Sequence, residues 1–351
     1  MTKADDANFL CIVPISAAAF SANLGRMKRG VIALCLTGVL SGCGGSRSAP
    51  TTPTPPPAPP PPPPIILSGR ASATNGRAPL AGVDVRYNGQ TALTDASGTF
   101  RLQWPGPAGS NQLTLASDQI VRRTLWLTVL ASRDVALDAI SMSNGFDLDF
   151  YRAFVRNGFE EPERLQPLRR WTQAPRIYLK TVDERGKHIS LVTQQMVTRA
   201  LRDNPSDWTG GRFGIAGIEL GTGTREGVSG WITIKWPNPA GDDYCGRAQV
   251  GVDGGWIELN YYLPACWCGG TRNRPLTVKH ELGHALGFWH TGDRQDLMAG
   301  LPRGICNQRP SARERMHAGI AYGRPVGNTD PDQDPSSAAT MRSLQSLVVI
   351  D

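Results

Sequence analysis

The segment from His280 to His290 reads His-Glu-Leu-Gly-His-Ala-Leu-Gly-Phe-Trp-His. It holds three of the five histidines of the 351-residue chain. Leu276–Leu286 carries several good helix formers, and Pro275 suits the first turn of a helix. His280 and His284 are four positions apart, so a helix would place their imidazoles one above the other on one face. The spacing therefore predicts a helix that presents two nitrogen ligands to one point.

Gly287 predicts the end of this helix. Glycine adopts left-handed backbone angles without steric cost, so the chain can turn there and bring His290 back as a third ligand. Three neutral imidazoles suit a zinc ion and leave its fourth tetrahedral position to water, which is typical of a catalytic site. Glu281, beside the first ligand, is placed to act as general base on that water, whose pKa zinc lowers toward about 7.

The pattern His-Glu-x-x-His-x-x-Gly-x-x-His resembles the signature of the metzincin clan of zinc metalloendopeptidases. The resemblance implies a methionine turn beneath the metal. Asp296-Leu297-Met298 supplies the candidate, with Met298 as an apolar floor that does not bind the ion. The short interval after His290 is similar to the matrixin branch. Ala299-Gly300 follows Met298, without the proline usual in matrixins or the tyrosine of some metzincins, so no tyrosine that stabilises the transition state is carried over.

Residues 146–327 are expected to form one metzincin-like catalytic α/β domain. Trp256–Asn260 precedes the predicted zinc helix and is, by the same resemblance, its antiparallel edge strand. An edge strand offers unpaired backbone groups, so an extended peptide substrate can add as a further strand. The same residues also fit a plain edge strand without a ligand.

Hydrophobic periodicity predicts the other elements of this domain. Ser190–Arg202 has the pattern of an amphipathic helix, and its apolar residues, Leu191 and Val192 among them, are expected to pack on the sheet. Further strands are predicted at Arg176–Lys180, Ile215–Leu220 and Gly230–Lys235.

A last helix is predicted after Ser311, because Ser311 and Glu314 form a capping box. His317 lies on that helix, and His188 lies in a polar loop. Either histidine could orient the zinc ligands, but we favour an ordinary core or solvated histidine for each.

Residues 65–140 are expected to form a separate small all-β sandwich. Short alternating segments are separated by turn signals such as Asn88-Gly89 and Asp95-Ala96-Ser97-Gly98. Pro79–Phe100 resembles the carboxypeptidase regulatory-like family, which implies a spacer or adhesion module with Phe100 pointing inward and no catalytic residue. The predicted strands are Ala81–Tyr87, Thr99–Gln103, Gln112–Leu115 and Leu125–Leu130.

Residues 1–43 carry an export signal. Met27-Lys28-Arg29 is a basic n-region, and Gly30–Leu40 is apolar but too short to span a bilayer. Leu40-Ser41-Gly42-Cys43 resembles a bacterial lipobox, which implies acylation of Cys43; a generic secretory signal is the alternative. The expected location is therefore the cell envelope, as an outer-membrane lipoprotein, or the medium. Membrane contact is expected only through the lipid.

Two further features flank this signal. Asp5 and Asp6 fit no n-region, so we expect translation to start at Met27. Residues 44–64 form a proline-rich linker, which favours an extended and semi-rigid spacer between the lipid and the folded domains.

The cysteines agree with export. Cys11 and Cys35 lie in the leader region and Cys43 is taken by lipid, which leaves an even number for an oxidising compartment. We expect two disulfides, with Cys266 and Cys268 bonded to different partners, but the spacing does not decide the pairing. An inhibitory thiolate at Cys245 is disfavoured, because the surrounding residues do not match the matrixin switch. The four remaining cysteines are Cys245, Cys266, Cys268 and Cys306.

The formal net charge of +7 comes from arginines scattered over the chain, with no basic run interleaved with aromatics. We therefore expect no nucleic-acid partner. Residues 328–351 are polar and rich in proline and aspartate, and are expected to be a disordered tail up to a short apolar end.

These patterns predict an exported zinc metalloendopeptidase, in which Glu281 activates water at an ion held by His280, His284 and His290. Two alternatives stay open: a surface adhesin with a structural zinc site, and a zinc amidase acting on cell-wall peptides. The peptide or protein substrate, the ligand of the sandwich, the mechanism of latency, any calcium requirement and the oligomeric state are not decided by the sequence.

Overall fold

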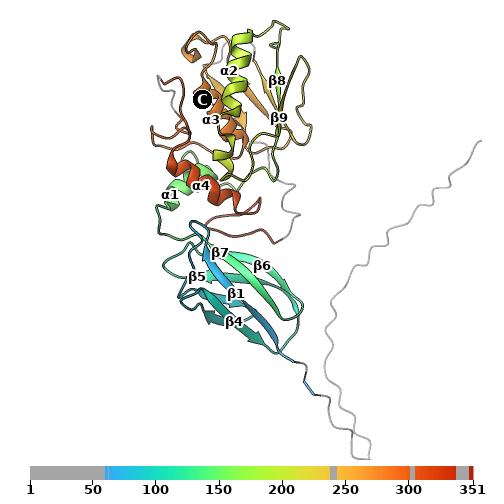
Figure 1. Ribbon diagram of the computed structural model, residues 1–351, viewed down its shortest axis with the longest axis vertical. Helices are drawn as coiled ribbons and strands as arrows, with labels where there is room; N and C mark the ends of the chain where they lie inside the picture. Colours follow the sequence, from blue (N-terminus) through green and yellow to red (C-terminus); the bar gives the residue numbers. More distant parts are fainter. Residues whose placement is uncertain (1–59, 62, 238–242, 301–304, 337–347, 351) are drawn as a thin grey trace, which may run out of the picture. The chain divides into compact units, whose positions relative to one another are not determined.

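The computed structural model describes residues 60–61, 63–237, 243–300, 305–336 and 348–350 (Figure 1). All of them belong to one compact unit, Pro60–Asp351. The predicted export signal, with Met27 and Cys43, and most of the predicted proline-rich linker lie outside the described residues. Among the residues that are described, no helix is long and apolar enough to cross a membrane.

The first half of this unit contains two β-sheets. One sheet has the order β4-β1-β7 and the other has the order β3-β2-β5-β6. The strands are β1 (Ile65–Ala73), β2 (Asp84–Tyr87), β3 (Gln90–Leu93), β4 (Thr99–Trp104), β5 (Gly109–Ala116), β6 (Arg123–Val129) and β7 (Arg133–Ala139). All four strands predicted for this region are present, and the protein is β-rich as expected. The sequence analysis missed β1, β3 and β7.

The alternation of buried and exposed side chains along the strands explains how these two sheets form a core. Every second residue of β4 is buried, and Phe100 points inward with 3% of its surface exposed, as predicted. The turn before β4 is fixed by Asp95, whose Oδ1 accepts hydrogen bonds from the backbone of Ser97 at 2.8 Å and Thr99 at 2.9 Å. Gly98 supplies the positive φ of 78° that this turn requires.

The second half contains a six-stranded mixed sheet with the order β13-β11-β12-β10-β8-β9. Four of its strands, β12, β10, β8 and β9, run parallel to one another. Strand β11 is antiparallel to β12, and β13 is antiparallel to β11. The strands are β8 (Arg176–Lys180), β9 (Gly217–Gly221), β10 (Trp231–Lys235), β11 (Gly246–Gln249), β12 (Trp256–Leu259) and β13 (Val348–Ile350). The strands predicted around β8, β9 and β10 are confirmed.

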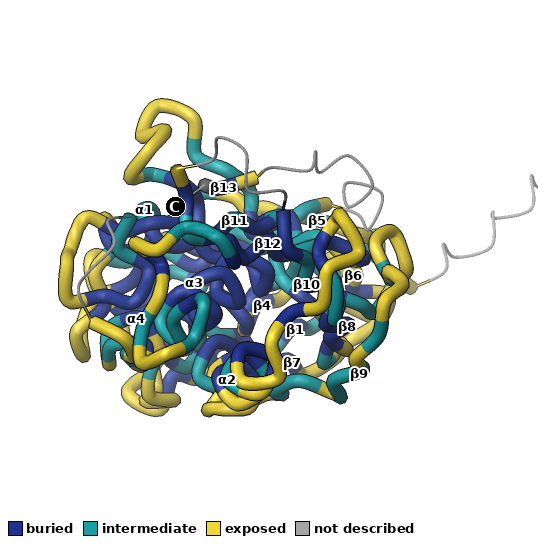
Figure 2. The backbone as a smooth tube through the Cα atoms, turned by 90° about the horizontal axis from the view of Figure 1, so that it is seen from above, coloured by how far each residue is buried: buried dark blue, intermediate teal, exposed yellow. Residues whose placement is uncertain are grey.

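The prediction that Trp256–Asn260 is an antiparallel edge strand is wrong. These residues form β12, which lies inside the sheet, parallel to β10 on one side and antiparallel to β11 on the other. The antiparallel strand is β11, and β13 covers its outer side. Figure 2 shows β13, β11 and β12 in succession along this part of the sheet.

Four α-helices accompany this sheet: α1 (Leu148–Arg156), α2 (Leu191–Arg202), α3 (Pro275–Ala285) and α4 (Ala312–Tyr322). The predicted limits of α2 and α3 are met within one residue. Helix α3 is buried from Thr277 to Ala285 (Figure 2), which is why its sequence has no clear polar face. The sequence analysis did not predict α1.

The prediction for the apolar face of α2 was wrong in part. Val197, Ala200 and Leu201 are buried, but Leu191 and Val192 are 72% and 57% exposed. They occupy the first turn of the helix, directly after the N-cap Ser190. Val197 and Leu201 are four positions apart, so they lie on one face of the helix, where they join the core.

The segment after Gly327 also differs from expectation, because residues 328–336 are packed and not disordered. Asp332 is 1% exposed and binds two arginines, Arg324 through Nε at 2.8 Å and Arg123 of β6 through Nη1 at 3.0 Å. Arg324 also donates from Nη1 to Asp138 of β7 at 2.5 Å. This boundary cluster (Arg123, Asp138, Arg324 and Asp332) joins the sandwich strands to the segment that follows α4.

Both expected disulfides form. Cys245 pairs with Cys266, and Cys268 pairs with Cys306, so the neighbours Cys266 and Cys268 have different partners as predicted. Disulfides persist in oxidising compartments, and the pair indicates an extracellular or periplasmic protein.

Candidate metal centre

The three histidines of the opening motif converge at one buried point. The Nε2 atom of His284 lies 3.0 Å from Nε2 of His280 and 3.2 Å from Nε2 of His290. Each of the three residues is 4% exposed or less. One ligand atom from each histidine lies within 4.8 Å of the others, so this group could hold a metal ion.

The second nitrogen of each ring explains why Nε2 is the one turned inward. Nδ1 of His280 lies 2.7 Å from the carbonyl oxygen of Leu297, and Nδ1 of His284 lies 2.7 Å from that of Phe288. Nδ1 of His290 lies 2.5 Å from Oε1 of Glu160. Because these partners are acceptors, each Nδ1 carries the proton and each Nε2 presents its lone pair to the centre.

This donor set passes a simple chemical test for a metal site. Three lone pairs that face one another repel unless a positive charge lies between them. Neutral imidazoles with their other nitrogen bound to an oxygen are the usual metal ligands of this type. The side chains are therefore prepared for an ion by their own hydrogen bonds.

The turn that returns His290 to the other two rings has the geometry expected of Gly287. Helix α3 ends at Ala285, and Gly287 has a φ of 112°. The amide of Phe288 donates to Gly283 O at 3.1 Å and the amide of Gly287 to His284 O at 2.8 Å, which is a Schellman motif. A Cβ atom at position 287 would collide with the carbonyl oxygen of Arg169, so only glycine fits.

Two backbone contacts then fix the ring of His290. The amide of Trp289 donates to Phe154 O in α1 at 2.8 Å, and the amide of Thr291 donates to Met298 O at 2.8 Å. Helix α1, which the sequence analysis did not predict, thus helps to position His290, the third histidine of the group.

Glu281 is fully buried between α3 and β11. Gly246, the first residue of β11, lies so close to its carboxylate that any Cβ there would overlap Oε1. The absence of a side chain at position 246 is therefore what leaves room for the Glu281 carboxylate beside its helix.

Met298 lies beneath the histidine-bearing helix. A Cβ atom at Gly283 would stand 2.5 Å from the Met298 sulfur and 3.1 Å from Cζ2 of Trp208, so both side chains pack on this glycine between His280 and His284. The carbonyl before Met298 belongs to Leu297 and holds the ring of His280. Met298 makes no polar side-chain contact among the described residues. It packs against α3 at Gly283, as expected for an apolar residue beneath the histidines.

Glu314 contributes more than the capping box that the sequence predicts. The box is present at the start of α4, with Ser311 and Glu314 as reciprocal partners. The same carboxylate also accepts the amides of Leu297 at 3.0 Å and Met298 at 2.8 Å. Burial raises the pKa of Glu314, against the opposing effect of these amides. No pattern in the sequence indicates that one residue both caps α4 and holds the backbone at Leu297 and Met298.

Glu160 was also missed, and no local signal could have revealed it, since it lies 130 residues before its partner His290. His317 is an ordinary core histidine, as we favoured. Its ring stacks on Phe146 with centroids 5.2 Å apart and links α4 to the backbone of Asp147. His188 is exposed and pairs with Val182 in an isolated bridge. Neither ring belongs to the three-histidine group.

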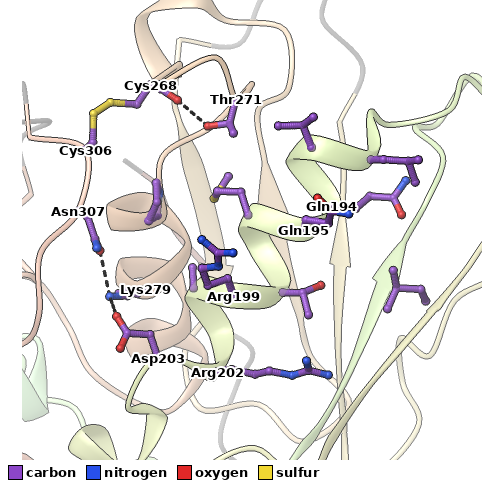
Figure 3. Close-up of a pocket in the computed structure, with 18 residues that line it drawn as sticks. Gln194, Gln195, Arg199, Arg202, Asp203, Cys268, Thr271, Lys279, Cys306 and Asn307 are labelled. Atoms are coloured by element: carbon purple, nitrogen blue, oxygen red, sulfur yellow. Dashed lines mark hydrogen bonds and ion pairs between the residues drawn. A yellow bond between two sulfur atoms is a disulfide. The ribbon is translucent and has the colours of Figure 1, made fainter.

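A groove lies on another side of α3, between α2 and the Cys268–Cys306 disulfide (Figure 3). Lys279 reaches into it, donates to Oδ1 of Asn307 at 2.9 Å and pairs with Asp203. The lining residues include none of the three histidines and not Glu281. The groove is thus separate from the candidate metal centre.

Comparisons with known proteins do not assign the chain. No protein-family model matches it, and no curated protein matches it. Among solved structures it is similar to a cohesin–X-dockerin complex from Acetivibrio cellulolyticus, at 20% identity and a TM-score of 0.20, over 23% of this chain and 62% of that one.

Two other likenesses are of the same kind. One is a DUF3823 family protein from Parabacteroides merdae, at 17% identity and a TM-score of 0.19, over 22% of this chain and 47% of that one. The other is a chlorocatechol 1,2-dioxygenase from Pseudomonas putida, at 13% identity and a TM-score of 0.17, over 22% and 60%. The chain spans less than two thirds of each of these three structures, and at such scores the likenesses carry no argument about fold or function.

Proposed function

We propose that this protein is an exported zinc metalloendopeptidase of the metzincin clan. The observation that carries the proposal is the convergence of three buried Nε2 atoms whose Nδ1 atoms are all bound to acceptors. The motif adds Glu281, buried one residue after the first ligand, and Met298 packed beneath the ligand helix. Each of these features matches the role that the metzincin resemblance assigns to the residue.

Zinc is the metal that these donors fit best. Three imidazoles are typical of zinc sites, whereas calcium and magnesium prefer oxygen ligands. A zinc ion held there would supply a Lewis acid that polarises a peptide carbonyl and lowers the pKa of a water molecule.

Glu281 is the residue of this chain that would move the proton. Its carboxylate would accept a proton from the water that attacks the peptide carbonyl carbon, and would pass it to the amine released when the C–N bond breaks. Burial against Gly246 restricts the carboxylate to one place, so it is oriented before a substrate arrives. A site that only stabilised the fold would have no need of a buried acid beside its ligands.

The test uses the full chain, with bound metal measured by mass spectrometry and cleavage measured on a peptide library that includes cell-wall peptides. Glu281→Gln keeps the shape of the side chain and removes the base. We expect zinc in both proteins and a loss of cleavage of at least about a hundredfold in the variant.

Two other outcomes would change the assignment. Zinc in both proteins, with no cleavage that depends on Glu281 for any substrate, would favour an adhesin with a structural zinc site. Cleavage confined to cell-wall peptides would favour the amidase. A wild-type chain that binds no zinc would contradict the proposal.

A further inference from the structure

Strand β13 covers the outer side of β11, the antiparallel strand that runs beside the metal centre. Its residues pair in register, with Val348 opposite Gln249, Val349 opposite Ala248 and Ile350 opposite Arg247. Without β13, β11 would be the edge of the sheet. An edge strand exposes backbone groups that an extended peptide can pair with.

The covered edge lies next to the candidate catalytic residues. Gly246, one residue before the paired segment, lies against the carboxylate of Glu281. Beyond the other end of β11, the amide of Gly251 donates to His284 O at 3.1 Å. A peptide paired along β11 would therefore run past the residues proposed to cleave it.

One side chain anchors β13. Val349 is 5% exposed and packs in a small separate cluster with Val250 and Trp289. Trp289 directly precedes the ligand His290. Val348 points the other way and is 44% exposed, as strand alternation requires. The cluster thus receives one aliphatic side chain beside the metal ligands.

We propose that β13 is an internal pseudosubstrate, which holds the strand-pairing edge of β11 and keeps an extended peptide out of the site. The proposal rests on the proposed peptidase function and adds its regulation and a substrate preference. The contacts that Val250 and Trp289 make with Val349 would be open to an aliphatic side chain of a substrate once β13 leaves. A strand of three residues with one buried anchor is short enough to be displaced by a longer peptide that pairs with β11.

The test compares Val349→Asp with the matched control Val348→Asp, both in the full chain. A carboxylate at position 349 would be buried without a partner, whereas at position 348 it would face solvent. We expect faster amide hydrogen exchange at residues 246–249 in Val349→Asp only, and a rise in peptide cleavage of about tenfold over the wild type. Zinc content is measured in all three proteins to show that the centre is intact.

A synthetic peptide copying residues 344–351 supplies the second arm. Added to Val349→Asp, it should slow both the exchange and the cleavage, and the same peptide carrying aspartate in place of Val349 should not. Equal cleavage by the wild type and Val349→Asp would overturn the pseudosubstrate and leave the peptidase standing. Zinc in every protein with cleavage in none would overturn the peptidase, and the inference with it.

Discussion

The chain buries two polar clusters, and they are built in opposite ways. In the boundary cluster, Arg324 is fully buried and its charge is met by Asp332 and Asp138. In the candidate metal centre, three buried histidines each turn one ring nitrogen toward the same point. The first cluster supplies both signs of charge from the chain itself, whereas the second supplies only acceptors. The difference indicates that the first holds structure together and that the second is made for a ligand.

The electrostatics of Arg324 support the structural reading. Burial alone would lower the pKa of its guanidinium, but Asp332 and Asp138 outweigh burial and raise it, so the charge is retained. Its Nη2 also donates to the hydroxyl of Thr74 at 2.8 Å. Each of the three guanidinium nitrogens therefore donates to a partner within the protein.

The largest expected fall in the free energy of unfolding comes from a substitution that disrupts the boundary cluster. Arg324→Ala removes the fully buried charge that pairs with Asp332 and Asp138, and leaves Arg123 as the ion-pair partner of both carboxylates. Removing one member of a buried pair costs about 3–5 kcal/mol. We expect the free energy of unfolding to fall by that amount in urea titrations. Arg225→Ala removes an ion pair with Glu219 that is 38% exposed on both sides, and should cost less than about 1 kcal/mol. Similar losses in the two variants would refute the structural role.

Glu314→Gln should have the next largest effect, because the Glu314 carboxylate accepts backbone amides both at the start of α4 and at Leu297 and Met298. The neutral amide offers one acceptor oxygen to backbone amides that now share a carboxylate, and hydrogen bonds to charged groups contribute about 2 kcal/mol each. We expect a loss of stability of about that size, with weaker zinc binding because the methionine turn carries the carbonyl that holds His280. Unchanged zinc affinity in a competition titration would show that the backbone at Leu297 and Met298 does not influence zinc binding by the three histidines.

A smaller effect sharpens the account of the metal centre. Glu160→Gln weakens the acceptor of His290 Nδ1, and such outer partners are worth about tenfold or more in metal affinity. We expect zinc affinity to fall by about tenfold while the metal-free protein keeps its stability. Glu161→Gln, at the exposed neighbouring position, is the control and should leave both unchanged. A loss of stability without a loss of zinc affinity would show that Glu160 stabilises the fold and does not tune the histidine.

The smallest expected effect is a pH dependence that belongs to neither cluster. Burial lowers the pKa of His317, although its hydrogen bonds to Arg313 and Asp147 oppose the shift. Below the ordinary histidine pKa of about 6.5, the unfolded chain therefore binds more protons than the folded one, and the free energy of unfolding falls as the pH drops. In metal-free protein, His317→Gln should flatten this fall between pH 7 and pH 5, whereas the exposed His188→Gln should not. Identical slopes for wild type and His317→Gln would contradict it.

The sequence predicts contacts between residues that are close together along the chain better than contacts between residues that are far apart. His280, Glu281 and His284 share one helix, and Gly287 ends it, so their arrangement follows from helix geometry alone. Glu160 and the second role of Glu314 arise only from the fold, because no local pattern says which distant acceptor meets a given ring. Strand β11 was not predicted at all, because Gly246–Gln249 has no apolar alternation. The antiparallel position was assigned to Trp256–Asn260 instead, since the sequence of a short strand does not determine which strands it pairs with.

The Cys245–Cys266 disulfide affects when the segment beside Glu281 becomes restrained, as well as where it lies. Cys245 directly precedes Gly246, the residue whose bare backbone accommodates Glu281. Closing a loop between residues 21 positions apart restricts the unfolded chain at that point. A newly made chain in a reducing cytoplasm lacks this restraint. The segment beside Glu281 therefore gains the stabilisation of this disulfide only in an oxidising compartment, either extracellular or periplasmic.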